Sequence, residues 1–172
     1  LADIPEDAQP SRYSPFAFTT RGGDPEGMVT SSGGRLRVQD EGSQLAALAL
    51  TRATPVAAGE RWLDLCAGPG GKTALLGAEA LAFGATLEAN EVALARAELV
   101  RRAVAAVPME IDVSVEDGRT RAARGRYSRI LVDAPCTGIG ALRRRPEARW
   151  RKSPADVPGL AQLQIELVLA AI

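Results

Sequence analysis

Short apolar runs alternate with longer segments of helical periodicity along most of the chain. The apolar runs predict strands at residues 61–66, 85–90, 110–115 and 128–133. The helical patterns predict helices at residues 70–82 and 91–106, and a further helix from about residue 155. Because strands that alternate with helices form right-handed βαβ units, we expect an α/β fold with a mostly parallel sheet and helices on both faces.

The first part of the chain follows a different pattern. Residues 1–38 contain frequent prolines and glycines, so we expect an irregular N-terminal segment there. A helix is predicted to begin at Asp40 or Ser43, either of which can cap it, and to end before Pro55. We therefore divide the chain into an irregular segment, 1–38, and one α/β domain, 39–172.

Composition and charge narrow the class of protein. The chain has 172 residues, of which 46% are hydrophobic, and this is enough to bury one core. Its formal net charge is zero, so a nucleic acid would have to be bound by a local basic patch. Two cysteines do not make a disulfide framework and favour a reducing, cytoplasmic setting. Since no apolar run reaches about 18 residues, we expect no contact with a membrane.

The most informative segment is the turn that follows the first strand of the predicted domain. Residues 64–73 read DLCAGPGGKT, in which an apolar run ends in a turn of small residues and a helix begins. Strand, turn and helix in this order form a cofactor pocket at the carboxyl end of a parallel sheet. Glycines let backbone N–H groups approach the ligand, and the helix N-terminus favours an anionic group.

Two nucleotide-binding patterns compete for this turn. A P-loop requires a glycine five residues before Gly71, where the chain has Cys66. The dinucleotide fingerprint requires a third glycine where the chain has Thr73. The run ILVDAP, residues 130–135, resembles a Walker B strand, so an NTP-binding site stays open as an alternative.

A second motif lies some 60 residues after the turn, at DAPCTG, residues 133–138. Together the two motifs resemble those of the RNA cytosine-5 methyltransferases of the Sun/NOL/NOP type, which include the bacterial ribosomal RNA small-subunit methyltransferase B. The resemblance extends over residues 32–47 and 123–151. It implies a Rossmann-like S-adenosylmethionine-dependent fold, with residues 39–172 as a partial methyltransferase catalytic domain that is incomplete at its C-terminus.

The resemblance implies S-adenosylmethionine as cofactor. Glu88, about 20 residues past the turn, is expected to accept hydrogen bonds from the ribose, unless it is an ordinary strand-end glutamate. Asp117 is expected to accept from the adenine amino group, unless it is only a turn residue. Lys72 is expected to face the methionine carboxylate; Asn90 and Glu91 are weaker candidates that also suit a helix start. The predicted cofactor-binding set is Cys66, Ala67, Gly68, Pro69, Gly70, Gly71, Lys72, Glu88, Asp117 and Asp133.

The DAPCTG motif supplies the two candidate catalytic residues, Asp133 and Cys136. The resemblance implies methylation of carbon 5 of cytosine through a covalent cysteine adduct at carbon 6. It assigns breakdown of that adduct to Cys136 and the binding of the flipped base to Asp133. The alternative is that Cys136 is a buried structural cysteine. No metal is expected in this chemistry.

The chain departs from the family pattern in two places. The attacking cysteine of the family belongs to a later Thr-Cys motif, and these 172 residues contain none. Because the chain starts at Leu1 and ends inside a predicted helix, we expect a fragment that is inactive alone; the alternative is a catalytically silent RNA- or cofactor-binding module. Ala93 stands where relatives carry a basic residue, and Arg96 is a possible substitute.

A basic segment, RRRPEARWRK, follows the second motif at residues 143–152. Arginines that contact phosphates beside an aromatic stacking surface suit single-stranded or loop RNA. The alternative is a solvated charged face. The predicted RNA-binding residues are Arg143, Arg144, Arg145, Arg149, Trp150 and Arg151. We therefore expect an RNA partner, ribosomal RNA in particular, for a monomeric protein.

Overall fold

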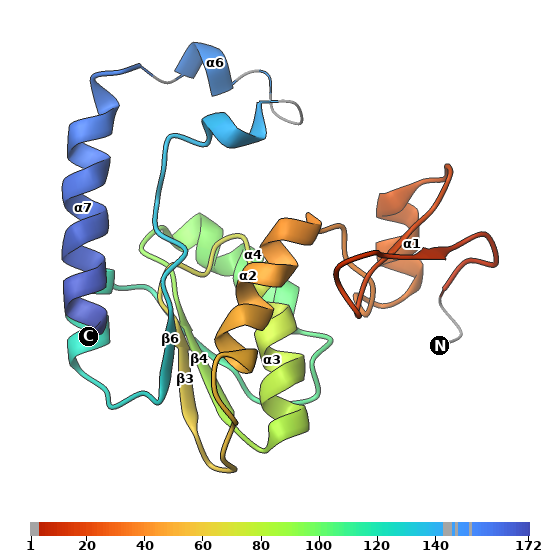
Figure 1. The fold of residues 1–172 in the computed structure, drawn as a ribbon, viewed down its shortest axis with the longest axis horizontal. Helices are drawn as coiled ribbons and strands as arrows, with labels where there is room; N and C mark the ends of the chain where they lie inside the picture. Colours follow the sequence, from red (N-terminus) through yellow and green to blue (C-terminus); the bar gives the residue numbers. More distant parts are fainter. Residues whose placement is uncertain (1–3, 143–145, 147, 152) are drawn as a thin grey trace.

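A parallel four-stranded sheet forms the centre of the molecule (Figure 1). The computed structural model describes residues 4–142, 146, 148–151 and 153–172. The strands are β3 (Arg61–Asp64), β4 (Thr86–Asn90), β5 (Asp112–Ser114) and β6 (Arg129–Leu131), in the order β5-β4-β3-β6. Every neighbouring pair in this sheet is parallel, which confirms the predicted α/β fold. The strands are shorter than the predicted runs because the apolar pattern continues into the turns.

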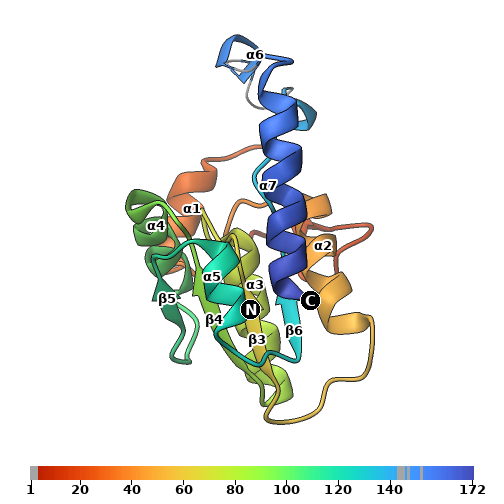
Figure 2. The same ribbon diagram turned by 90° about the vertical axis from the view of Figure 1, so that its left-hand side faces the viewer.

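Helices cover both faces of this sheet, as Figures 1 and 2 show. The helices α2 (Glu41–Arg52), α3 (Gly71–Phe83) and α4 (Leu94–Val104) supply the apolar residues that pack on one face. On the other face lie α5 (Gly118–Ala123) and α7 (Asp156–Ala171). The helix α5 was not predicted, because its six residues include two arginines and give no readable apolar stripe.

The alternation of side chains along β3 explains how one short strand supports two cores. Trp62 packs with Leu76 of α3 on one face, and Leu63 packs with Leu167 of α7 on the other. All four side chains are buried. Successive strand residues point to opposite faces, so a strand buried on both sides reads as a continuous apolar run.

The N-terminal segment contains more regular structure than the sequence predicts. Two short strands, β1 (Gln9–Pro10) and β2 (Phe18–Thr19), pair antiparallel, and a helix, α1 (Pro25–Ser31), follows them. The loop between the strands is attached to α2 through Glu41, which accepts hydrogen bonds from the backbone N–H groups of Tyr13 (3.0 Å) and Ser14 (3.3 Å). These contacts join residues far apart in sequence, which local patterns do not reveal.

The remaining elements lie beyond the end of β6. A 3-10 turn, η1 (Ile139–Ala141), and a short helix, α6 (Ala148–Arg151), connect β6 to α7. No helix in the described part of the chain is both long enough and apolar enough to span a membrane.

Candidate functional site

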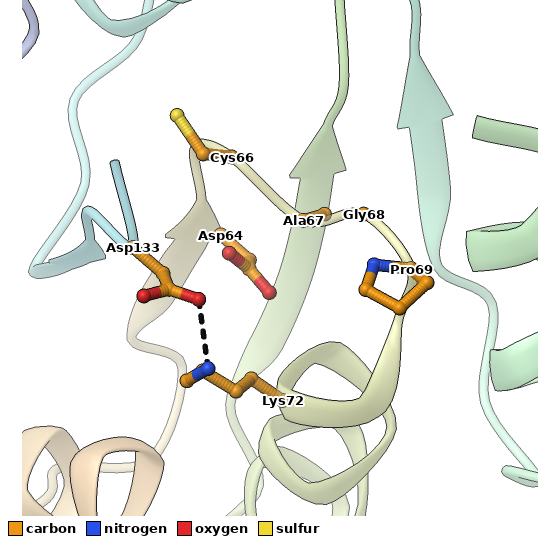
Figure 3. A pocket seen from close by; sticks show the side chains of 7 residues that line it. All are labelled: Asp64, Cys66, Ala67, Gly68, Pro69, Lys72 and Asp133. Atoms are coloured by element: carbon orange, nitrogen blue, oxygen red, sulfur yellow. Dashed lines mark hydrogen bonds and ion pairs between the residues drawn. The ribbon is translucent and has the colours of Figure 1, made fainter. Parts of the chain in front are cut away.

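A pocket opens at the carboxyl ends of β3 and β6 (Figure 3). It is lined by Asp64, Cys66, Ala67, Gly68, Pro69, Lys72 and Asp133. Six of these seven residues belong to the set predicted from sequence, and the structure brings them together from two segments about 60 residues apart. Asp64 was not predicted, because within DLCAGPGGKT it reads as the end of a strand.

Gly70 sets the course of the turn between β3 and α3. Its φ of +99° lies in the left-handed region, which favours glycine. A Cβ atom added at Gly70 would lie 2.4 Å from Cβ of Ala103 and 2.9 Å from Cα of Val100. The turn therefore packs directly on α4, and α3 begins at the next residue, Gly71, with its first N–H groups facing the crevice end of the sheet.

The other side of the turn is held by Glu91, which directly follows β4, and by Arg96 of α4. Glu91 accepts a hydrogen bond from the Gly68 N–H (3.1 Å), and Arg96 Nη2 donates to the Gly68 carbonyl (2.5 Å). Arg96 Nε also lies 3.4 Å from Glu91 Oε2, and the Glu91 side chain is buried. Arg96, which the sequence offered as a substitute for a basic residue at position 93, therefore contacts the turn.

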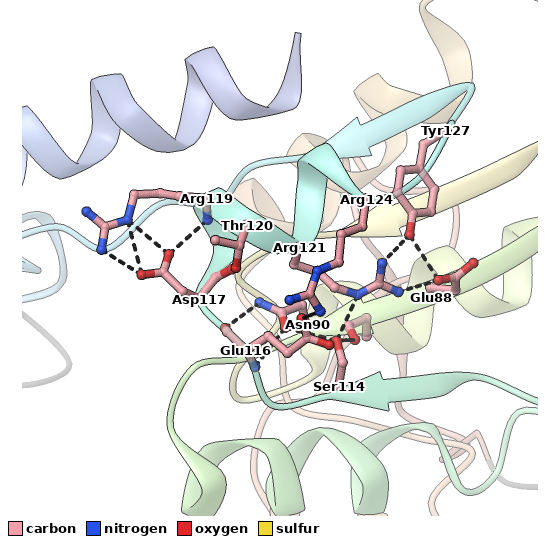
Figure 4. A network of polar contacts seen from close by, with 11 residues as sticks. Glu88, Asn90, Ser114, Glu116, Asp117, Arg119, Thr120, Arg121, Arg124 and Tyr127 are labelled. Carbon is pink, nitrogen blue, oxygen red and sulfur yellow. Dashed lines mark hydrogen bonds and ion pairs between the residues drawn. The ribbon is translucent and has the colours of Figure 1, made fainter.

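Glu88 lies elsewhere, and its predicted position at the end of a strand is wrong. It occupies the middle of β4, opposite Leu63 of β3, because the strand continues to Asn90. Its carboxylate accepts from Arg61 at 2.7 Å. It also accepts from Tyr127 (3.0 Å) and pairs with Arg121 (Figure 4). The strand-end carboxylate at the turn is Glu91, three residues further along the chain.

Asn90 joins the carboxyl ends of three strands. Its Nδ2 donates to the carbonyls of Leu65 (3.2 Å) and Glu116 (3.1 Å). Its Oδ1 accepts from the Ser114 hydroxyl (2.9 Å) and the Glu116 N–H (3.2 Å). A buried amide with all these partners is a rigid connection, so it fixes the segment that leads to Asp117.

Asp117 begins α5 at the same end of the sheet, as its place after the third predicted strand implied. Its side chain caps the helix by accepting from the Arg119 N–H (2.9 Å). The Arg119 guanidinium contacts both carboxylate oxygens (Figure 4). These hydrogen bonds from Arg119 lower the pKa of Asp117 to about 2, so the group is an ionised acceptor at neutral pH.

Lys72 and Asp133 form the polar wall of the pocket. Lys72 Nζ lies 2.7 Å from Asp133 Oδ2 and 3.4 Å from the Ser43 hydroxyl of α2. Beneath them Asp64 is fully buried, with Oδ2 accepting from Thr73 Oγ1 at 2.7 Å. Among the described residues Asp64 Oδ1 has no hydrogen-bond partner. Burial raises the pKa of Asp64 to about 7.

The two cysteines differ in environment. Cys136 is exposed on the turn after Asp133, so it is not a buried structural cysteine. The side chain of Gln164 donates to the Pro135 carbonyl at 2.7 Å, and this hydrogen bond connects the turn to α7. Cys66 is partly buried, and desolvation raises the pKa of its thiol to about 11. A neutral thiol is a poor nucleophile, which leaves Cys136 as the reactive candidate.

Part of the basic segment can be placed. Arg149, Trp150 and Arg151 form α6 and are exposed, with Trp150 at 84% of its full accessible surface. Figure 1 shows α6 beyond the carboxyl end of the sheet, on the side where the chain leaves β6. Arg143, Arg144 and Arg145 lie outside the described residues.

Comparison with known proteins identifies sequence relatives. The sequence model described as "16S rRNA methyltransferase RsmB/F" matches residues 53–172. A "putative methyltransferase Rv1407" of Mycobacterium tuberculosis is 54% identical over 161 residues, which cover 94% of this chain and 35% of that protein. "Ribosomal RNA small subunit methyltransferase B" of Yersinia enterocolitica is 39% identical over 116 residues, 65% of this chain and 26% of that protein. The chain thus spans about a third of its curated relatives or less.

Solved structures show the same fold. The crystal structure of PH0851 superimposes with a TM-score of 0.82 and 28% identity, over 99% of this chain and 39% of that one. The structure of NSun6 from Pyrococcus horikoshii with SFG gives a TM-score of 0.67 and 23% identity, over 83% of this chain and 35% of that one. Both chains are longer than this one and share its fold over the residues that superimpose.

Proposed function

Since the chain belongs to the 16S rRNA methyltransferase RsmB/F family, we propose that it binds S-adenosylmethionine and serves methyl transfer to carbon 5 of cytosine in ribosomal RNA. One observation carries the proposal. Glu91 and Lys72 lie around the turn after β3, whose backbone N–H groups lead into the N-terminus of α3. Asp117 lies at the same end of the sheet, between β5 and α5.

The residues at this edge match the polar groups of the cofactor. S-adenosylmethionine carries ribose hydroxyls and an adenine amino group, which are donors, and a methionine carboxylate, which is an acceptor. In the proposed mode Glu91 replaces Glu88 as the acceptor for the ribose, and Asp117 accepts from the adenine. The α3 N-terminus and Lys72 face the carboxylate. The orphaned Asp64 Oδ1 beside the pocket supports a ligand or water there, because buried polar atoms rarely lack partners.

The proposed chemistry uses the turn after β6. When bound, the cofactor supplies a methyl group on a sulfonium. Asp133, held by Lys72, accepts from the exocyclic amino group of a flipped cytosine, and the exposed Cys136 thiol lies three residues further on. In this account Cys136 assists breakdown of the adduct, in which carbon 5 loses its proton and the attacking thiol leaves carbon 6, and an accessible thiol is needed for this role.

A complete turnover also needs a second cysteine as nucleophile. The sequence has two cysteines, and Cys66 is a neutral thiol of the cofactor turn. We therefore expect these 172 residues to bind the cofactor without completing methyl transfer. The exposed Arg149, Trp150 and Arg151 of α6 are proposed to contact the RNA near Cys136.

Calorimetric titration of the chain with S-adenosylmethionine, and separately with ATP and Mg²⁺, tests the proposal. Saturable binding of S-adenosylmethionine without binding of ATP is the expected result. Binding of ATP alone would revive the NTP-binding alternative and contradict the proposal. A folded chain that binds neither ligand would contradict the assignment of this pocket as a cofactor site.

A further inference from the structure

Arg119 holds the carboxylate of Asp117 in one orientation. Arg119 Nε lies 3.0 Å from Oδ1 and 3.1 Å from Oδ2 of Asp117, and Nη2 lies 2.6 Å from Oδ2. The backbone N–H of Arg119 also donates to Oδ1 at 2.9 Å. Bidentate arginine–carboxylate pairs fix the plane of the carboxylate as well as its charge.

The guanidinium is itself held from its other side. Arg119 Nη1 lies 2.6 Å from Oε2 of Glu166 on α7, and Gln162 Nε2 donates to Oε1 of the same glutamate at 2.9 Å. The packing of the two helices is close, because a Cβ added at Gly118 would lie 2.7 Å from Leu167. Arg119 therefore bridges α5 and α7, and its ion pair with Glu166 opposes a rotation of the Asp117 side chain that would carry the guanidinium with it.

The backbone before Asp117 is fixed as well. The Asn90 side chain accepts from the N–H of Glu116 and donates to its carbonyl. It also donates to the carbonyl of Leu65, which follows β3, so the segment before Asp117 is connected to the end of that strand. Both the main chain and the side chain of Asp117 are thus set before any ligand arrives. Groups arranged in advance lose little freedom on binding, so they discriminate between ligands more sharply.

The hydrogen bonds from Arg119 leave Asp117 able to accept another hydrogen bond. A carboxylate offers about four lone-pair sites, and Arg119 presents three N–H donors to it: the backbone N–H, the Nε–H shared between the two oxygens, and one Nη2–H, so about one site remains. The Asp117 side chain remains 41% exposed, so a ligand can reach it. An ionised carboxylate accepts hydrogen bonds only, and it repels a ligand atom that is also an acceptor.

On this geometry, and resting on the proposed function, we infer that Arg119 is the positioning residue for purine specificity: it holds Asp117 as a fixed acceptor that selects a 6-amino over a 6-oxo purine. The selected ligand is the adenosyl group. A hypoxanthine presents a carbonyl oxygen at position 6, which the fixed carboxylate rejects because neither group can donate.

The test measures the affinities of S-adenosylhomocysteine and S-inosylhomocysteine by calorimetry for the wild type and for Arg119→Ala, Arg119→Lys and Arg124→Ala. Arg124 is the matched control, because it follows the last residue of the same helix and pairs with a partly buried carboxylate, Glu116. We expect the wild type to prefer the adenosyl ligand by about tenfold or more, and Arg124→Ala to keep that ratio. In Arg119→Ala the ratio falls to about threefold or less, with an intermediate ratio in Arg119→Lys.

Other outcomes overturn the inference in distinguishable ways. Equal binding of both ligands by the wild type would show that the pocket does not read the purine, while leaving the cofactor proposal intact. Weaker binding by Arg119→Ala with an unchanged ratio would show a structural role only. No binding of either ligand by the folded wild type would overturn the proposed function together with this inference. If Arg119→Ala fails to fold, Glu166→Gln, which loosens the guanidinium from the α7 side, must lower the ratio or the inference fails.

Discussion

Lys72 and Asp133 lie 61 positions apart in the sequence, and their side chains meet at 2.7 Å in the pocket. Lys72 belongs to the turn-and-helix segment after β3, and Asp133 to the turn after β6. The pair joins the proposed cofactor site to the proposed cytosine site by one contact between side chains. Its lysine is 17% exposed and its carboxylate 52%, so solvent screens the attraction only in part.

A double-mutant cycle will measure this contact. For Lys72→Met, Asp133→Asn and the double variant, urea denaturation should give a coupling free energy of about 0.5–1 kcal/mol in favour of the pair. Matched values for the pair Arg101 and Glu98, which lies on the surface of α4, should be about 0.5 kcal/mol or less. A coupling energy of zero for Lys72 and Asp133 would show that the two turns are not joined energetically.

Asp64 should make stability depend on pH. Its folded pKa of about 7 exceeds the unfolded value of about 4, so the folded state holds a proton that the unfolded state has already lost. The free energy of unfolding contributed by this group therefore falls as pH rises from about 4 to about 7. Asp64→Asn removes the titration, so its stability should decline less over that range. Identical pH profiles for the two proteins would contradict the assignment.

Gly70 should tolerate no side chain. Gly70→Ala combines a left-handed φ with a Cβ 2.4 Å from Ala103, and we expect a loss of about 3 kcal/mol in the free energy of unfolding. Gly59 separates the two effects, because its φ is +82° but an added Cβ there meets no described neighbouring atom within 4 Å. Gly59→Ala should cost about 1 kcal/mol. Equal losses in the two variants would mean that the turn does not pack tightly on α4.

The cysteines should react at different rates. Cys136 is exposed, whereas Cys66 is partly buried with a pKa raised to about 11 by desolvation. At pH 8, iodoacetamide should alkylate Cys136 at least about tenfold faster than Cys66, as read by peptide mass spectrometry. Faster modification of Cys66 would place the reactive thiol on the wrong turn for the proposed chemistry.

Local patterns were sufficient for the parts of the fold that local physics determines. The run ending at Leu65, the glycine turn and the start of α3 follow from residues adjacent in sequence. The family resemblance implied that Cys66, Lys72 and Asp133 belong to one site, and all three line one pocket, because the carboxyl ends of parallel strands meet at one edge of the sheet.

The sequence did not predict the features of the site that depend on contacts between residues far apart in the chain. The predicted strand ends at residue 90, as β4 does, but Glu88 was preferred to Glu91 for its distance from the glycine turn, and that spacing does not show which carboxylate reaches the turn. Burial of Asp64 beneath Lys72 depends on α3 and on Thr73, so nothing in DLCAGPGGKT separates it from an exposed strand-end aspartate. The orientation of Arg119, which holds Asp117, depends on Glu166 of α7, and Glu166 is 47 positions away from Arg119 in the sequence.

The central claim is that the turn after β3 binds S-adenosylmethionine with Glu91 as the strand-end acceptor. The most direct measurement is calorimetric titration of S-adenosylmethionine into the wild type, Glu91→Gln and Glu88→Gln. The two variants make the same chemical change three residues apart on one strand and its end. We predict that Glu91→Gln weakens binding about tenfold or more, while Glu88→Gln stays within about threefold of the wild type. The reverse order, or an equal loss in both folded variants, would contradict the account.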